Sequence, residues 1–126
     1  MERHVKFLRC EVCGNIVGHI KDSGAPLTCC GQHMTVLKAN STDAAQEKHV
    51  PVAKKSGDKL NVTVGSVLHP MLNEHFIEWI AVVTDNTVQR FVLAPGEDPK
   101  AVAYLYADKG EVYEYCNLHG LWKTEF

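Results

Sequence analysis

The stretch FIEWIAVV, residues 76–83, is apolar at every position except Glu78. A continuous apolar run of this length is typical of a β-strand that is covered on both faces. Upstream, KLNVTVGSV at residues 59–67 alternates Leu60, Val62 and Val64 with polar neighbours. That period of two indicates a strand with one buried face. Together the two stretches predict a domain built from β-strands.

Three more short stretches downstream have the composition of strands. They are VQRFVL (88–93), AVAYLYA (101–107) and EVYEY (111–115), the last of which we expect to be the final strand. The segments TDNT, APGEDPK and DKG separate them and carry turn-forming residues. No amphipathic stretch of about ten or more residues predicts a helix here. Short strands at a spacing of roughly ten residues favour an antiparallel sandwich or barrel, so the expected fold class is all-β.

The first 36 residues differ in composition from the rest of the chain, being poor in apolar residues and rich in Cys and Gly. A segment of this kind buries little surface and needs a covalent or metal cross-link. We therefore expect a small metal-binding domain at residues 1–36 and a β-domain at 37–126. Residues 37–48, LKANSTDAAQEK, read as the linker that leads into the second domain. Within it, Thr42 or Asp43 could cap one helical turn through residues 44–46.

The whole-chain composition excludes several classes of protein. The chain has 126 residues and a formal charge of -2, with no run of lysine and arginine, which argues against a nucleic-acid partner. The first ten residues have no apolar core typical of a secretory signal, and no run of about 18 apolar residues predicts a membrane span. The expected compartment is the cytoplasm. In its reducing conditions, clustered cysteines bind metal more often than they form disulfides.

Four of the five cysteines form a first set near the N-terminus, in CEVCG and CCGQ. Cys-x2-Cys brings two sulfurs to one metal on a tight turn, and four thiolates make a tetrahedral site for zinc or iron. The spacing leaves the choice between these metals open. Because neighbouring side chains of a regular strand point to opposite faces, the adjacent pair requires a sharp bend of the backbone. The predicted ligands are Cys10, Cys13, Cys29 and Cys30.

The fifth cysteine, Cys116, lies in CNLHG, far from the others and three residues before a histidine. Three more histidines lie at predicted strand ends or in loops, where a rigid scaffold can direct them to one point. Taken singly, each is more often structural or solvated than a ligand. Structural zinc takes four ligands, whereas four nitrogens with one axial sulfur suit iron and leave one position open. The complete predicted set is His49, His69, His75, His119 and Cys116.

The ordered motifs CEVCG, CCG, EKHVP, HPM, EH, WI and CNLHGLW resemble the desulfoferrodoxin family, the two-iron class of superoxide reductases, over essentially the whole chain. The resemblance implies that the four-cysteine set holds one iron in a desulforedoxin-like domain. It implies that the four histidines and the axial cysteine hold a second iron in an immunoglobulin-like domain. Glu47 and Lys48 fall on the family's glutamate and lysine beside the open position. The resemblance further implies a homodimer and a rubredoxin-type electron donor.

The activity so implied is reduction of superoxide to hydrogen peroxide without release of oxygen, a detoxification reaction under oxidative stress. Glu47 and Lys48 would be its catalytic residues, although the pair also reads as an ordinary solvated charge pair. Trp79 and Trp122 read as core aromatics, and Tyr115 as packing near the thiolate. Two other functions stay open: an electron carrier with a structural second metal, and a zinc-bearing interaction module. A colourless protein would favour zinc.

Overall fold

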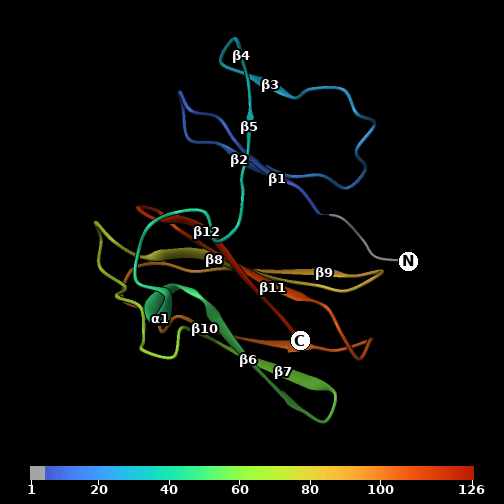
Figure 1. Ribbon diagram of the computed structural model, residues 1–126, viewed down its shortest axis with the longest axis vertical. Coiled ribbons are helices and arrows are strands. Elements are labelled where there is room, and N and C mark those ends of the chain that lie inside the picture. The colour runs from blue at the N-terminus through green and yellow to red at the C-terminus, as the bar shows by residue number, and fades with distance from the viewer. Residues whose placement is uncertain (1–4) are drawn as a thin grey trace. The chain divides into compact units, whose positions relative to one another are not determined.

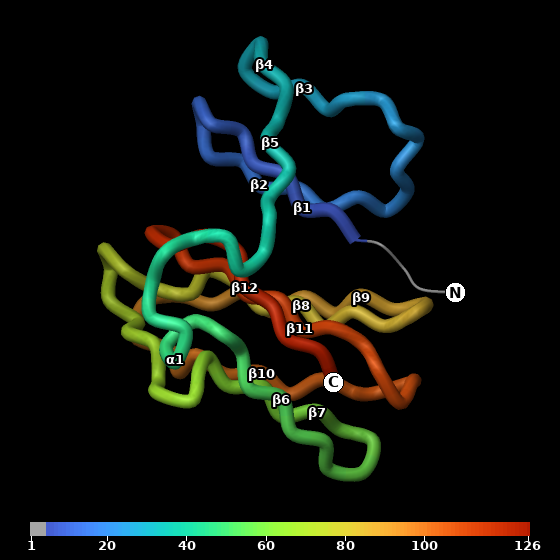
Figure 2. Tube along the Cα trace, in the orientation of Figure 1, coloured from blue at the N-terminus to red at the C-terminus, as the bar shows by residue number. Residues whose placement is uncertain are grey.

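The computed structural model describes residues 5–126, so the first four residues of the expected small domain lie outside the described part. Within that part the chain divides into two compact units, residues 5–38 and residues 39–126. Figures 1 and 2 trace both units. No helix among the described residues is long and apolar enough to cross a membrane.

The small unit consists of two short antiparallel sheets. In the first, β2 (Ile16–Gly18) and β5 (Thr35–Val36) flank β1 (Phe7–Arg9). In the second, β3 (Thr28–Cys29) pairs with β4 (Gln32–His33). Its buried hydrophobic residues are Phe7, Leu8 and Cys10. So small a core contributes little to folding, and the unit depends on a cross-link.

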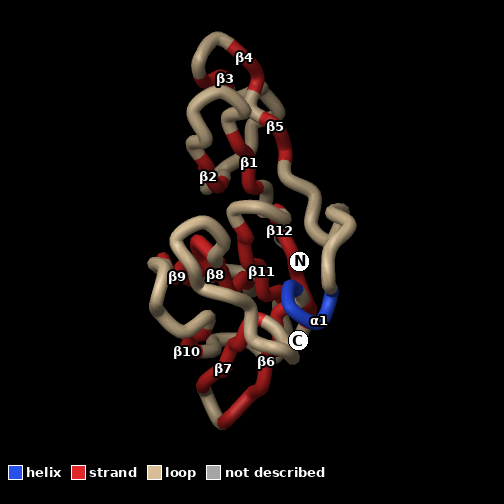
Figure 3. The backbone as a smooth tube through the Cα atoms, turned by 90° about the vertical axis from the view of Figure 1, so that its left-hand side faces the viewer, coloured by secondary structure: helices blue, strands red, loops and turns tan. Residues whose placement is uncertain are grey.

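The large unit is a sandwich of two antiparallel sheets, coloured almost entirely as strand and loop in Figure 3. One sheet has the order β10-β7-β6 and the other has the order β12-β11-β8-β9. The expectation of an all-β fold with a sandwich domain is confirmed. The strands are β6 (Pro51–Ser56), β7 (Lys59–Val64), β8 (Ile77–Val83), β9 (Val88–Val92), β10 (Lys100–Tyr104), β11 (Glu111–Cys116) and β12 (Gly120–Glu125).

The sequence patterns locate the core correctly. Leu60, Val62 and Val64 of β7 are buried and lie in the cluster between the sheets, whereas Asn61 is exposed. Strand β8 is buried on both faces, as its apolar run predicts. Two strands escape the sequence analysis, because β6 has the polar sequence PVAKKS and β12 follows EVYEY, which is therefore not the final strand.

The linker also differs from the expectation. The helical turn α1 spans Gln46–His49, later than the predicted 44–46, and neither Thr42 nor Asp43 caps it. The His49 ring bonds back to the Ala45 carbonyl and so stabilises the turn in the later position. The N–H of Asn40 donates to the Leu121 carbonyl, which attaches the linker to β12.

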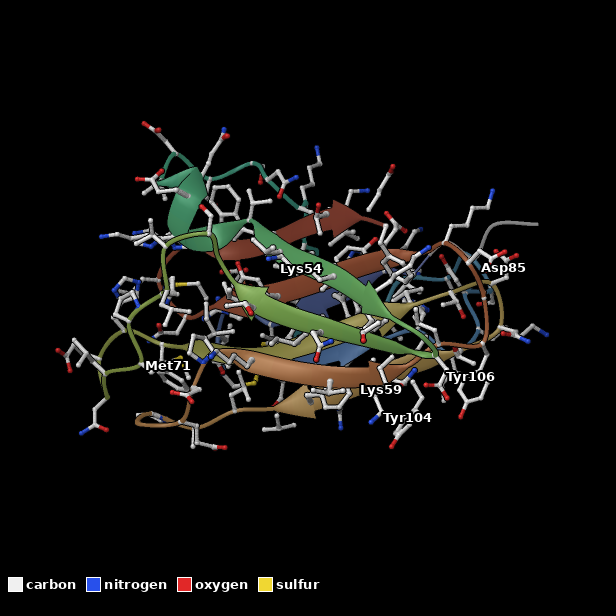
Figure 4. The ribbon with its side chains drawn as sticks, turned by 90° about the horizontal axis from the view of Figure 1, so that it is seen from below. Lys54, Lys59, Met71, Asp85, Tyr104 and Tyr106 are labelled. Atoms are coloured by element: carbon white, nitrogen blue, oxygen red, sulfur yellow. The ribbon has the colours of Figure 1, made fainter. Side chains whose placement is uncertain are left out.

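Side chains and packing join the edges of the two sheets. The side-chain Nε2 of Gln89 in β9 donates to the backbone carbonyl of Tyr104 in β10 at 2.6 Å. The backbone N–H of Tyr104 donates to the side-chain Oε1 of Gln89 at 3.1 Å. Figure 4 shows Tyr104 beside Lys59, whose ammonium lies 5.8 Å from the centre of the Tyr104 ring. At the opposite edge β12 contacts β6. The sandwich is therefore closed in the manner of a barrel, which holds the loops at its end in fixed positions.

One ionisable carboxyl group lies in this core. Glu114 of β11 is 0% exposed, and neither of its carboxylate oxygens has a hydrogen-bond partner among the described residues. It shares a strand face with Val112, a member of the core cluster. Burial raises the pKa of Glu114 well above its usual range, which favours the protonated carboxyl in the folded chain.

This burial predicts a pH-dependent stability difference between the native chain and Glu114→Gln. An acid whose folded pKa is raised contributes stability below its unfolded pKa, and that contribution is lost as the pH rises towards the folded pKa. Glutamine does not titrate. The unfolding free energy of Glu114→Gln relative to the native chain should therefore rise between pH 5 and pH 8, by at most about 1.4 kcal/mol per pH unit. Denaturant titrations of the metal-replete proteins at both pH values measure this difference. The exposed Glu125→Gln serves as control, and a difference independent of pH would contradict the prediction.

Candidate metal centres

The small unit brings the four predicted cysteines together. Their sulfurs all lie within 4.8 Å of one another, and no disulfide joins any of them. The turn after β1 presents Cys10 and Cys13, and the β3–β4 hairpin presents Cys29 and Cys30. Cys30 has φ 52°, in the left-handed region, and this is the sharp bend that the adjacent pair requires. Both sulfurs of the pair thereby face one point.

Backbone and side-chain N–H groups surround these sulfurs. The backbone N–H groups of Cys13 and Val12 lower the pKa of Cys10 to about 6, which favours its thiolate. The side chains of Cys13, Cys10 and Cys29 raise the pKa of Cys30 to about 12. Four thiolates are therefore stable together only around a cation, and binding of that cation releases the protons. The donor set fits a metal that prefers sulfur, such as iron or zinc.

Asn15 is a functional neighbour of this centre that the sequence analysis did not find. Its Nδ2 lies 3.7 Å from the Cys29 sulfur, in position to donate to it, and its carbonyl accepts the Cys10 N–H. The signal available in the sequence was a lone polar residue directly after CEVCG. Hydrogen bonds to a ligand sulfur orient it and adjust the potential of the bound metal.

The large unit brings the second predicted set together at one end of the sandwich. Their ligand atoms, four ring nitrogens and one sulfur, also lie within 4.8 Å of one another. His49 is the last residue of α1, His69 follows the turn after β7, and His75 precedes β8. Cys116 is the last residue of β11, and His119 lies in the β11–β12 turn.

The orientations of two rings provide a test for a metal. Nδ1 of His49 lies 2.7 Å from the Ala45 carbonyl, and Nδ1 of His69 lies 2.7 Å from the Pro70 carbonyl, so both Nδ1 atoms must donate. In the neutral rings both Nε2 atoms are then acceptors, yet they face each other at 3.2 Å. Nε2 of His75 is buried without a hydrogen-bond partner among the described residues. A cation among these rings would satisfy all three Nε2 atoms.

The protonation states agree with this interpretation. Burial lowers the pKa of His49 and His75, and it lowers that of His69 to about 4. These imidazoles are therefore neutral at neutral pH, which is the form that binds metal. Burial raises the pKa of the Cys116 thiol, while backbone N–H groups of Leu118 and His119 oppose that shift. A bound cation would complete the stabilisation of its thiolate.

Aromatic and amide side chains support the ligands. Trp122, predicted only as a core aromatic, is buried and stacks on the His49 ring with centroids 5.0 Å apart, and its Nε1 donates to the His119 carbonyl at 3.1 Å. Trp79 is also buried and stacks on Tyr115. Asn117 bonds the backbones of Glu74 and Phe76, the residues on either side of His75. The sequence analysis did not find Asn117, although its place between two ligands was a signal.

The structure places Glu47 and Lys48 on α1, directly before His49, with both residues exposed. No salt bridge among the described residues joins these two side chains, which weakens their interpretation as a simple charge pair. Burial is the main cause of the lowered pKa of His49 and His75, and the Lys48 charge adds to it.

An all-β chain with one four-thiol site and one site of four imidazoles and a thiol is a non-haem metalloprotein with two different mononuclear centres. The family model described as Desulfoferrodoxin matches residues 41–125, and that of the Desulfoferrodoxin N-terminal domain matches residues 2–37. The chain belongs to the desulfoferrodoxin family. Its two donor groups match the two iron centres of a desulfoferrodoxin.

Two relatives and one solved structure match nearly the whole chain, and a second solved structure matches part of it. The chain is 46% identical over 125 residues to the desulfoferrodoxins of Syntrophotalea carbinolica and Nitratidesulfovibrio vulgaris, with 99% of each chain covered. It is similar to the superoxide reductase from Treponema pallidum, with a TM-score of 0.79 and 34% identity over 97% of this chain and 99% of that one. A superoxide reductase from Giardia intestinalis matches 64% of this chain and 97% of its own, with a TM-score of 0.56 and 30% identity.

The two donor groups belong to different compact units, which predicts that they lose metal independently. Cys13→Ser removes one of four sulfurs and should lose or weaken the first metal. The second should be retained, because its ligands are held by the core of the large unit. Iron per chain and the absorption spectrum measure both, with Val12→Ser, an exposed position in the same turn, as control. Loss of both metals from Cys13→Ser would show that the units are not independent.

Proposed function

We propose that this chain is a superoxide reductase. Superoxide, one electron and two protons give hydrogen peroxide, so no superoxide is oxidised and no oxygen is formed. The observation that carries the proposal is the group of four imidazoles and one buried thiol at the end of the sandwich. Solved proteins of similar fold that are named superoxide reductase support it.

The proposal assigns a metal to each donor group. Cys10, Cys13, Cys29 and Cys30 would hold one iron in a desulforedoxin-like domain at residues 1–36. The four histidines and Cys116 would hold the other in a catalytic domain at residues 37–126, in which residues 37–48 are the linker. One-electron transfer to superoxide is the chemistry that this second iron supplies when bound. Closed structural zinc sites take four donors, and the five donors here favour iron.

The residues around the second centre would favour an anionic substrate. Imidazoles carry no charge to compensate the cation, so the centre stays positive and attracts superoxide. The Cys116 sulfur is the one strong electron donor of the set, and its hydrogen bonds from the Leu118 and His119 N–H groups moderate that donation. Lys48 adds a second positive charge beside the site. Glu47 would supply a carboxylate to the oxidised centre, since a hard oxygen prefers the more highly charged ion.

The remaining parts of the proposal concern partners and place. A rubredoxin-type protein would return the electron after each turnover, because the reaction consumes one electron per superoxide. The chain would act as a homodimer in the cytoplasm and protect it from superoxide. These assignments rest on the family resemblance.

Cys116→Ser tests the role of the thiolate. A hydroxyl is a harder and poorer electron donor than a thiolate, so the variant should keep its fold and first iron but lose superoxide reduction. The reduced native protein should form one peroxide per superoxide and no oxygen, measured by pulse radiolysis with peroxide and oxygen assays. Near-normal reduction by the variant would remove the thiolate from the mechanism, and oxygen release by the native protein would contradict the reductase itself.

Lys48→Ala tests electrostatic capture of superoxide. A cation at about 5 Å, screened by water and salt, contributes about 1–2 kcal/mol, so the bimolecular rate should fall roughly five- to thirtyfold. Its dependence on ionic strength should weaken as well. Lys48→Arg keeps the charge and should retain most of the rate. The control is Lys54→Ala, on the β6 strand shown in Figure 4. If both Lys48 variants match the native chain at low salt, Lys48 takes no part in capture.

A further inference from the structure

The short helix α1 contains a carbonyl that no N–H of the helix can satisfy. The Val50 N–H donates to the Gln46 carbonyl at 2.9 Å and closes the single turn. By the same helical pattern, the Glu47 carbonyl would accept the N–H of residue 51. Residue 51 is Pro51, which has no N–H. The sequence therefore ends the helix after one turn and leaves the Glu47 carbonyl without a helical partner.

The turn after β7 supplies that carbonyl with two donors instead. The Val67 N–H donates to it at 2.9 Å, and the Ser66 hydroxyl donates to it at 3.2 Å. Gly65 packs beneath the same turn of helix. A Cβ at that position would lie 2.7 Å from the Glu47 carbonyl oxygen and 2.9 Å from that of Val50, so no side chain fits without moving the backbone. Residues 65–67 thus form a seat for α1.

This seat connects two segments that carry ligands of the histidine centre. His49 is the last residue of α1, and His69 follows the seat by two residues. The His69 N–H donates to the Val64 carbonyl at 2.8 Å, which fixes the other end of the turn. The Val67 side chain is 51% exposed, so the contribution of that residue here comes from its backbone.

We propose that Gly65, Ser66 and Val67 are positioning residues that hold Glu47 and Lys48 beside the histidine centre. The roles given to Glu47 and Lys48 rest on the proposed function. The His49 and His69 rings have further anchors in their Nδ1 bonds to Ala45 and Pro70. The side chains of Glu47 and Lys48 are exposed and have no comparable anchor among the described contacts. Damage to the seat therefore moves these two side chains more than it moves the ligands.

The first measurement needs no turnover. Hydrogen exchange of the Val67 amide reports directly on its bond to the Glu47 carbonyl. Gly65→Ala should accelerate that exchange roughly tenfold, the effect of weakening one hydrogen bond by about 1.4 kcal/mol, while both irons stay bound. Ser66→Ala should accelerate it less, because the Val67 bond survives, and Ser66→Thr, which keeps a hydroxyl, should restore the native rate. Ser56→Ala, an exposed serine at the end of β6, is the matched control.

The second measurement follows the consequence for the centre. Gly65→Ala should change the oxidised absorption spectrum and lower the superoxide rate several-fold, towards that of Lys48→Ala. In a Glu47→Ala background, Gly65→Ala should no longer alter the oxidised spectrum, since the carboxylate through which it acts is gone. A structural role alone would instead lower iron content and stability in both backgrounds.

The outcomes separate the seat from the proposed function. If the Val67 amide exchanges at the native rate in both Gly65→Ala and Ser66→Ala, the proposed role of residues 65–67 is wrong. It is also wrong if exchange is faster but the oxidised spectrum and the superoxide rate do not change. If Gly65→Ala does not fold, the comparison of Ser66→Ala with Ser66→Thr decides the same question. If the native chain does not reduce superoxide, the proposed function fails, and the exchange of Val67 still tests whether the seat exists.

Discussion

Several potential metal-ligand atoms converge on one point, and this convergence is the constraint on which the large unit depends. Nε2 of His49 faces Nε2 of His69 at 3.2 Å, each an acceptor because its Nδ1 donates to a carbonyl. With a buried Nε2 of His75 and the buried Cys116 sulfur beside them, this arrangement is unfavourable without a cation. The chain thus accepts a cost in the metal-free state in exchange for a preformed site.

That cost is tolerable because the sandwich supplies stability from elsewhere. The residues between the two sheets are almost all apolar and fully buried, and the bonds from Gln89 to Tyr104 close one edge. The ligands then lie where strands end and loops begin, on the most rigid support available. The small unit has the opposite balance. Its core is very small, and a metal held by its four sulfurs would provide the cross-link that apolar burial does not.

The two exposed charges beside the histidine centre have a different kind of support. Glu47 and Lys48 lie on a helix of one turn, too short to be stable by itself. Pro51 limits its length, and the turn after β7 donates hydrogen bonds to the carbonyl that Pro51 leaves free. The loop that carries His69 therefore also determines where the charged side chains lie. Ligand geometry and electrostatics at the centre are in this way coupled through backbone hydrogen bonds.

The sequence alone determined the fold class and the core of β7 and β8, because period-two patterns are local signals. It also predicted the members of both donor groups, the first from local cysteine spacing and the second from the order of family motifs along the chain. It did not show the polar β6 or the mixed β12, which are strands because neighbouring strands pair with them. Nor did it reveal the buried Glu114, the ring orientations, the stacking of Trp122 on His49, or the seat at residues 65–67. These features arise from contacts between residues far apart in the chain. Only the tertiary structure decides which nitrogen of a ring faces inward, because the carbonyl that fixes it is positioned by the fold.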